Sequence, residues 1–286
     1  MRTFTVRQLA VAAILGSFGG AASLAQAAPV LWTGGGDGVS WTDGNNWLNS
    51  SPPMNSPPQT PPADNNYTDQ GAEFNAVATS ITVPTLQQVS GLQFDTAGWA
   101  LNSAQIDTGP IISNGVGTNT ISGVVNYSGG TDANGYISPA TWHVGIGNTL
   151  AVGTMYLNNA TVILDGGGQV TLTSEGIWGW GTANDVNIDN ATLQINYATP
   201  YYQPDSASGV ITLENPGESF VDLQTTVANT ETYFGSEIVG NGGTLEATDL
   251  GNGYTQVGLV AAPEPSTVGL LTLAAVGGLW RRRRRA

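Results

Sequence analysis

The sequence has no cysteine, and its long central part has no lysine and no arginine. All seven basic residues lie near the two ends, at Arg2, Arg7 and Arg281 to Arg285. Without cysteine, disulfides and cysteine-based zinc sites are excluded, so size and backbone pairing must hold the fold. Without lysine, a phosphate-binding P-loop is excluded. A histidine-based nucleophilic triad would have to use His143, because it is the only histidine.

Negative charge dominates the part of the chain between its two basic ends. Of the 21 acidic residues only Glu264 lies near the C-terminus, which leaves twenty between residues 28 and 262 and a net charge of about −20 there. Such a surface repels nucleic acid and anionic lipid, so we expect no nucleic-acid partner. Dissolved salt screens this charge and bound divalent cations neutralise it.

The first 27 residues have the pattern of a secretory signal peptide. Two arginines precede an apolar stretch of small residues, and Ala25 and Ala27 provide the small-x-small pattern of a cleavage site. The pattern predicts a mature chain that begins at Ala28. An uncleaved N-terminal anchor is the alternative.

Residues 263–286 form a second targeting segment with three parts. Pro263, Glu264 and Pro265 predict an open, extended stretch, since proline donates no backbone hydrogen bond and restrains the residue before it. Residues 268–280 are apolar and predict a transmembrane helix, which at ~1.5 Å per residue reaches ~20 Å across a hydrocarbon core of ~30 Å. The cluster Arg281, Arg282, Arg283, Arg284 and Arg285 predicts a cytoplasmic end, which places everything before it outside.

This tail resembles the PEP-CTERM protein-sorting signal of Gram-negative bacteria, in the order, spacing and terminal position of its Pro-Glu-Pro, apolar helix and arginines. The resemblance implies recognition by an exosortase, a membrane-embedded processing enzyme, with removal of the tail near Pro263, Glu264 and Pro265. It also implies a transient inner-membrane intermediate, and an exopolysaccharide or biofilm setting with exopolysaccharide as a candidate partner. An ordinary C-terminal anchor is the alternative.

Residues 28–80 predict an N-terminal cap and a proline-rich loop. Trp32, Trp41 and Trp47 stand among glycine and asparagine residues that favour tight turns. Three proline pairs within residues 51–63 are too many for a strand.

Residues 81–262 predict an all-β domain. Short β-prone runs alternate with glycine, asparagine and aspartate, and no helical period is visible. The segment that begins at Asn159 (Asn-Ala-Thr-Val-Ile-Leu) is similar to the one at Asn190 (Asn-Ala-Thr-Leu-Gln-Ile). Further copies start at Asn148 and Gly242, and such units predict stacked turns of a solenoid.

Residues 91–101 and 242–245 also resemble the strand repeats of autotransporter passenger domains. That resemblance implies a right-handed parallel β-helix, and a β-sandwich is the alternative because it uses similar short strands. In the β-helix we expect five side chains to point inward: Leu150, Val162, Leu164, Leu193 and Ile195.

Catalytic patterns are sparse, so we expect no enzyme. Polysaccharide lyases of the β-helix class need basic groups that this domain lacks. Glycoside hydrolysis needs only two carboxyl groups at a defined separation. The candidates are Asp165, Glu175, Asp185 and Asp189, but none forms a recognisable pair. His143 lies in a predicted strand, which favours a structural role.

Two weaker patterns concern binding. Trp178 and Trp180 lie on one face of an extended segment and could stack on sugars, with Tyr197, Tyr201 and Tyr202 nearby; packing between the solenoid and a loop is the simpler interpretation. Asp37, Asp43, Asp185 and Asp189 lie among glycine and asparagine residues, as calcium ligands often do, although turn chemistry also explains them. We expect no cofactor other than calcium.

Taken together, these patterns predict an exported, non-enzymatic surface or extracellular-matrix protein, sorted through its tail. The alternative is a surface protein that binds carbohydrate or hydrolyses it with two carboxylates.

Overall fold

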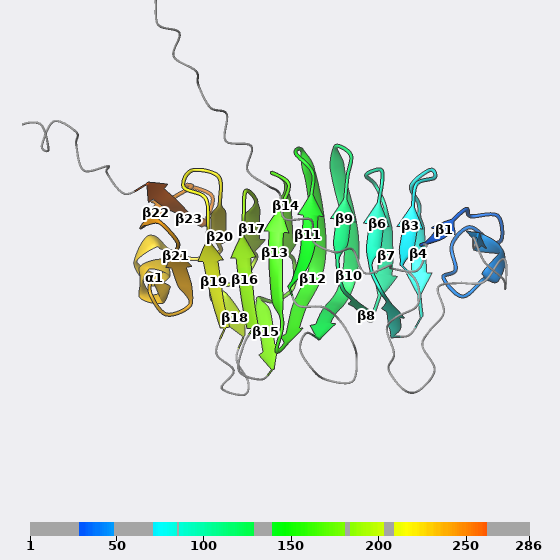
Figure 1. The fold of residues 1–286 in the computed structure, drawn as a ribbon, viewed down its shortest axis with the longest axis horizontal. Helices are drawn as coiled ribbons and strands as arrows, with labels where there is room; N and C mark the ends of the chain where they lie inside the picture. The colour runs from blue at the N-terminus through cyan, green and yellow to red at the C-terminus, as the bar shows by residue number, and fades with distance from the viewer. Residues whose placement is uncertain are drawn as a thin grey trace, which may run out of the picture.

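A computed structural model describes residues 29–48, 71–84, 86–128, 139–180, 184–202 and 209–261. These residues form a β-solenoid of about six turns, which are stacked along the long axis with their strands directed across it (Figure 1). The predicted parallel solenoid is confirmed, and the alternative β-sandwich is wrong, because strands of successive turns pair in parallel rather than within antiparallel sheets. Each turn contributes strands to three faces.

The first face is a ten-stranded sheet that runs the whole length of the solenoid. Its parallel strands are β1 (Val30–Trp32), β3 (Ala72–Phe74), β6 (Leu92–Phe94), β9 (Ile111–Ser113), β11 (Ala140–Val144), β13 (Thr161–Asp165), β16 (Asn184–Ile188), β19 (Gly209–Leu213) and β21 (Ile238–Gly240). At the N-terminal edge, β2 (Trp47–Leu48) pairs with β1 in the antiparallel sense.

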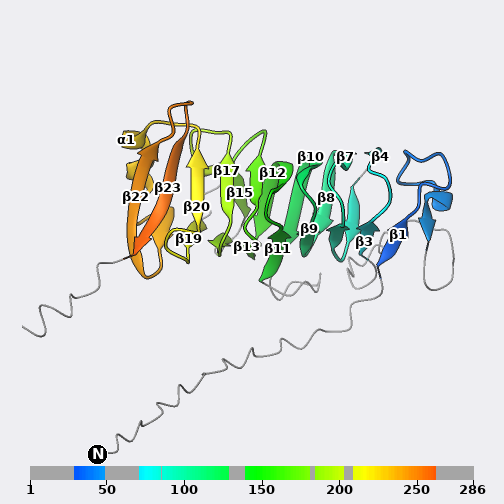
Figure 2. The same cartoon turned by 90° about the horizontal axis from the view of Figure 1, so that it is seen from above.

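The second and third faces belong to one bent sheet of thirteen strands. The second face holds β4 (Ser80–Val83), β7 (Ala100–Ser103), the first halves of β10 (Gly117–Ser128) and β12 (Asn148–Asn158), β14 (Gln169–Leu172), β17 (Thr192–Ile195) and β20 (Phe220–Leu223). The third face holds β5 (Gln87–Val89), β8 (Gln105–Thr108), the second halves of β10 and β12, β15 (Ile177–Trp180) and β18 (Tyr201–Tyr202). Figure 2 shows the first two faces as opposite layers.

The bend between the second and third faces depends on glycine. The register of β10 against β12 shifts between Ile121 and Val124, where both strands turn the corner. A Cβ on Gly123 would lie 2.2 Å from the carbonyl oxygen of Ser103, and one on Gly153 would lie 2.5 Å from that of Gly123. Only glycine therefore fits where the backbones of successive turns approach this closely.

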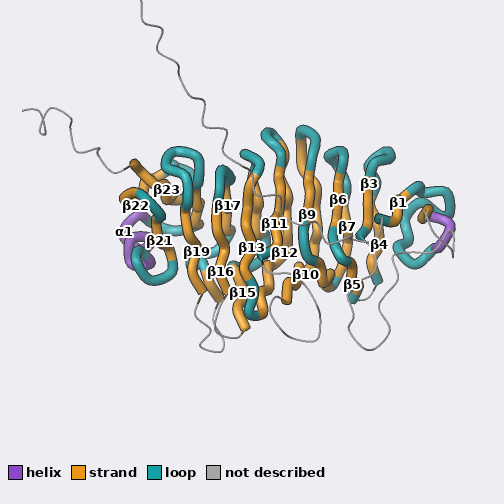
Figure 3. The backbone as a smooth tube through the Cα atoms, viewed as in Figure 1, coloured by secondary structure: helices purple, strands orange, loops and turns teal. Residues whose placement is uncertain are grey.

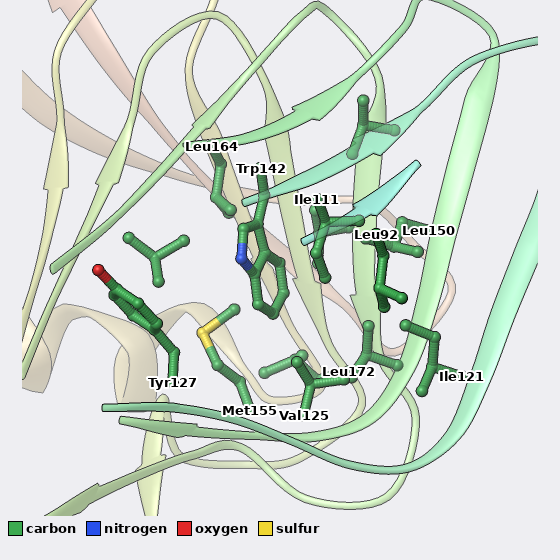
Figure 4. Packing of buried hydrophobic residues seen from close by; sticks show 14 of the residues in the cluster. Leu92, Ile111, Ile121, Val125, Tyr127, Trp142, Leu150, Met155, Leu164 and Leu172 are labelled. Atoms are coloured by element: carbon green, nitrogen blue, oxygen red, sulfur yellow. The ribbon is translucent and has the colours of Figure 1, made fainter. Parts of the chain in front are cut away.

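Alternating side chains fill the interior between the faces. All five residues predicted to point inward are fully buried: Leu150, Val162, Leu164, Leu193 and Ile195. In the middle of the solenoid Trp142, Tyr127 and Met155 meet across the core (Figure 4). The indole N–H of Trp142 donates to the carbonyl oxygen of Gly109 at 3.2 Å, which satisfies its polar atom.

The sequence repeat proved to be local rather than one turn of the solenoid. The segment after Asn159 forms β13 on the first face, whereas the one after Asn190 forms β17 on the second. Both asparagines have a positive φ, of 46° and 57°. The repeat therefore marks a left-handed turn that precedes a strand, and the predicted copy at Gly242 lies in an antiparallel hairpin instead.

Both ends of the solenoid are closed by other structure (Figure 3). At the N-terminus, Trp32, Trp41 and Trp47 pack on Phe74, with the 3-10 helix η1 (Gly44–Asn46) beside them. The first complete turn starts at Ala72, before the predicted boundary at 81.

At the C-terminus, β23 (Thr255–Ala261) pairs antiparallel with β20 and β22 (Gly243–Asp249), next to α1 (Val227–Thr230) and η2 (Glu231–Tyr233). The hairpin covers the last parallel edge, which would otherwise pair with another chain.

Candidate functional site

The predicted targeting residues lie outside the described part of the chain. These are Ala25 and Ala27 of the signal peptide, Pro263, Glu264 and Pro265 of the processing site, and Arg281 to Arg285. The proline-rich residues 51–63 also lie outside it. Among the helices that the structure describes, none has the length and apolar character to cross a membrane.

Asp37 and Asp43, two of the calcium candidates, hold the turns of the N-terminal cap. Asp37 Oδ1 accepts hydrogen bonds from the backbone N–H groups of Val39 and Ser40, at 2.9 and 2.8 Å. Asp43 Oδ2 accepts from the N–H of Asp37 at 3.0 Å. The hydrogen bond from Val39, then those from the Asn46 side chain and the Ser40 backbone, lower the pKa of Asp37.

Asn46 joins these turns from inside the cap, where its side chain is fully buried. Its Oδ1 accepts from the N–H groups of Gly36 and Gly38, both at 2.9 Å. Its Nδ2 donates to Asp37 Oδ1 at 2.7 Å and to the carbonyl oxygen of Ser40 at 2.9 Å. Protein donors thus occupy Asp37 Oδ1 and both carboxylate oxygens of Asp43. Across the described residues, no group of three or more His, Asp or Glu side chains is arranged to hold a metal ion.

Asp165 and Asp189 lie in a row of polar side chains on the outside of the first face. His143 Nδ1 lies 2.7 Å from Asp165 Oδ1, the one His–carboxylate contact in the described ranges. Leu164 pairs with Ile188 and Ile188 with Leu213, so Asp165, Asp189 and Glu214 follow one another on successive turns. Asn215 donates to Asp189 and Asn241 donates to Glu214. His143 is therefore a half-exposed strand residue whose ring contacts the carboxylate of Asp165.

The four carboxylates considered for glycoside hydrolysis are divided between faces. Asp165, Asp185 and Asp189 belong to strands β13 and β16 or their ends on the first face. Glu175 lies in the turn before β15 and lines a groove on the third face. The fold thus separates Glu175 from the other three.

The groove lies on the outside of the third face and has a volume of about 560 Å³. Six residues line it: Gln105, Val124, Thr154, Tyr156, Glu175 and Trp178. They come from β8, β10, β12 and β15, four successive turns, together with the turn before β15. Residues far apart in sequence therefore form one continuous surface.

Register explains the shape of this groove. Gln105 pairs with Val124 and Val124 with Thr154, so these three non-aromatic side chains form one outward row. Gly176 follows in that row, since Met155 pairs with Ile177. The neighbouring outward row contains Asn126, Tyr156 and Trp178, paired in that order. The groove lies where the non-aromatic row runs beside the row that contains the larger rings of Tyr156 and Trp178.

The predicted aromatic pair occupies one face, as expected. Trp178 is partly exposed and Trp180 is 54% exposed, both on the outside of β15. Tyr201 instead points inward and donates its hydroxyl to the carbonyl oxygen of Asn184 at 2.9 Å. Burial, with the nearby charges of Asp185 and Glu237, raises the pKa of Tyr201 well above its usual range.

Three further residues of this area need comment. Tyr197 is in a turn after β17 and does not line the groove, and the side chain of Tyr202 lies outside the described residues. Tyr156 lines the groove but was not predicted. The alternation of Thr154, Tyr156 and Asn158 with buried Met155 and Leu157 was the signal that could have identified it.

Comparison with known protein families supports the sorting signal that the sequence predicts in the tail. Residues 261–284 match the PEP-CTERM protein-sorting motif. Neither a curated protein nor a solved structure matches the chain. PEP-CTERM signals are recognised by exosortase, a membrane processing enzyme, and they mark proteins for export to the cell surface or the medium. The chain is therefore an exosortase-targeted surface or secreted protein, which carries a PEP-CTERM sorting motif behind a β-solenoid.

Proposed function

We propose that the protein is a non-enzymatic structural component of the cell surface or extracellular matrix, made where exopolysaccharide or biofilm is produced. The observation that carries the proposal is the PEP-CTERM motif at residues 261–284. The solenoid is consistent with such a role, because each turn contacts only its neighbours and the stacked turns form a long, extended surface. Its net charge of about −20 suits an extracellular, salt-rich setting.

The absence of catalysis is part of the proposal. Asp165 and Asp189 lie side by side on the outside of an open sheet, and each has a hydrogen-bonding neighbour, His143 or Asn215. A glycosidase needs its two carboxyl groups on opposite sides of a bound sugar, with the acid in an environment that keeps it protonated. Asp165 has a side-chain exposure of 36% on the outside of β13, and Asp189 is exposed just after β16. Incubation with a panel of polysaccharides should release no reducing ends, and release by the wild-type protein would overturn this point.

Processing of the tail is the first test of the proposal. The Pro-Glu-Pro is expected outside the membrane, the helix is short for the bilayer, and the arginines hold its end in the cytoplasm. We expect an inner-membrane intermediate and a surface form that lacks the residues after about Pro265. Intact-mass measurement of the protein from each cell fraction checks this. A surface form that retains Trp280 and the arginines would show that the segment is only an anchor.

Two variants separate recognition from insertion. Replacing Pro263, Glu264 and Pro265 by alanine leaves the helix and arginines in place, so the protein should insert but stay in the inner membrane with its tail attached. Replacing Arg281 to Arg285 by glutamine removes the positive-inside signal, so sorting itself should be disturbed. Normal surface delivery of the alanine variant would contradict a role for the Pro-Glu-Pro.

The matrix role has its own test. Deletion of the gene should reduce the mass or cohesion of the extracellular matrix, while growth in suspension stays unchanged. The wild-type gene should restore the matrix and the alanine variant of the Pro-Glu-Pro should not. An unchanged matrix in the deletion strain would remove this role without affecting the assignment of export.

A further inference from the structure

We propose that the groove on the third face binds a neutral polysaccharide, with the chain parallel to the solenoid axis. The inference rests on the proposed function only in that it places the protein outside the cell, where such polymers occur. It starts from the position of the groove, which crosses β8, β10, β12 and β15 and so runs along the axis rather than around it.

Aromatic rings provide the first contribution to binding. Tyr156 and Trp178 are paired neighbours on adjacent turns and both line the groove. Trp180 lies two residues further along the same strand, on the same side, and is 54% exposed. Flat aromatic side chains in a surface hollow suit the apolar faces of pyranose rings.

Polar groups along the same groove provide the second contribution. Gln105 offers an amide, Thr154 a hydroxyl and Glu175 a carboxylate, and all three line the hollow. Together they can donate to and accept from sugar hydroxyls. A groove for a lipid chain or an apolar peptide would not place these polar groups beside the aromatic ones, so the mixed lining favours carbohydrate.

The spacing of the turns fits a polymer. Neighbouring strands in a sheet are about 4.8 Å apart, and this is close to the length of one sugar unit in an extended β-linked chain. Gln105, Val124, Thr154 and Gly176 occupy equivalent places on four successive turns. A polymer along this row would meet a comparable position of the protein with each sugar, which a single monosaccharide cannot exploit.

Charge selects a neutral polymer. No lysine or arginine occurs between residues 28 and 262, and the charged side chain that lines the groove is Glu175. An acidic polysaccharide would meet this carboxylate and the negative field of the whole domain without any cation to balance it. A neutral chain avoids that repulsion and retains the stacking and hydrogen bonds.

The test uses the exported protein purified from producing cells. Calorimetric titration with cellohexaose, laminarihexaose and mannohexaose should show binding of at least one of them. Glucose, and a hexamer of galacturonic acid as the acidic probe, should bind much more weakly. Trp178→Ala should weaken binding about tenfold, the change expected for loss of about 1.4 kcal/mol. Trp180→Ala should also weaken it, and Glu175→Gln should reduce it without making the acidic hexamer the preferred ligand.

Controls keep loss of binding distinct from loss of folding. Ile146→Ala removes an exposed apolar side chain, 80% exposed, from the turn between β11 and β12 and should leave affinity unchanged. Circular dichroism and thermal melts identify any variant that fails to fold. If Trp178→Ala fails to fold, the affinity of Trp180→Ala decides the test, because Trp180 is more exposed and its removal disturbs packing less. The inference is overturned if no neutral hexamer binds, if both tryptophan variants bind like wild type, or if the acidic hexamer is the preferred ligand. Export and tail removal are measured separately by fractionation, so failure of either proposal is recognisable.

Discussion

At the residue scale, single buried polar side chains control local geometry. Asn46 is the clearest case, because its four hydrogen bonds join residues 36, 37, 38 and 40 beneath the tryptophans of the cap. Such a side chain is costly to remove, because its loss breaks all four hydrogen bonds at once and leaves a cavity where the buried amide packed.

We expect Asn46→Ala to destabilise the protein by about 2–3 kcal/mol, mainly through the cap. The matched control is Asn45→Ala, since Asn45 is exposed and its amide donates only to Asp43 Oδ1. Urea unfolding followed by tryptophan fluorescence measures both. Equal midpoints for the two variants would mean that the buried network contributes little.

Buried carboxylates should make stability depend on pH. Burial raises the pKa of Asp222, although a hydrogen bond from Gln256 opposes this, and burial raises the pKa of Glu237 in the same direction. The folded state then binds these protons more tightly than the unfolded state, so stability is lost as pH rises from the unfolded pKa through the raised folded pKa. Asp37 acts oppositely, since its lowered pKa stabilises the fold above the unfolded value and that contribution is lost as the pH falls.

Asp222→Asn tests the raised pKa. It preserves a hydrogen-bonding side chain next to Gln256 but removes the charge. We expect a melting temperature a few degrees above wild type at pH 8, and a smaller difference near pH 4, where the raised pKa favours the protonated carboxyl in the folded state. Thermal melts across this range check it. A variant less stable than wild type at pH 8 would indicate that the hydrogen bond outweighs desolvation.

At the scale of elements, the bend that creates the third face is the feature on which the groove depends. Gly123 and Gly153 stack at this bend in β10 and β12. A Cβ on Gly153 would lie 2.5 Å from the carbonyl oxygens of both Ser122 and Gly123, and backbone atoms of a neighbouring turn cannot move aside independently.

Gly153→Ala should therefore destabilise the solenoid by about 1–3 kcal/mol. Gly145→Ala is the control, because its added Cβ would find no atom closer than 3.6 Å and its φ is not in the left-handed region. Denaturant midpoints and glycan affinity should both fall for the first variant and stay near wild type for the second. If Gly153→Ala were as stable as wild type, the close approach of the turns would not restrict this position.

At the scale of the whole molecule, unbalanced negative charge opposes folding. Asp165, Asp189 and Glu214 follow one another on turns about 4.8 Å apart, and the domain has no lysine or arginine to compensate. Screening by salt or binding of calcium should relieve this repulsion in the compact state more than in the unfolded chain.

We therefore expect the melting temperature to rise in both calcium and sodium chloride, relative to a low-salt buffer with chelator. Asp189→Asn should be more stable than wild type at low salt and respond less to added salt. An unchanged melting temperature in all three buffers would contradict the role of charge. A response to calcium far above that to sodium chloride at equal ionic strength would indicate specific binding rather than screening.

The fold class could be predicted because its signals are local. Short strands between glycine and asparagine turns indicated a solenoid, and alternation within strands identified Leu150, Val162, Leu164, Leu193 and Ile195 as inward. The PEP-CTERM tail is also a contiguous pattern, so its residues could be identified directly. Each of these features depends only on residues that are close together in the sequence, so the sequence by itself was enough to determine them.

Which strand lies beside which was decided only by the tertiary structure. The Asn-Ala-Thr segments look equivalent, but Val162 pairs with Val186 and Leu193 with Val170, on different faces. The groove likewise depends on stacking of Gln105, Val124 and Thr154. The physical reason is that each turn of the solenoid has its own length, so the register between turns depends on how the core packs and where the chain bends, not on any local sequence pattern.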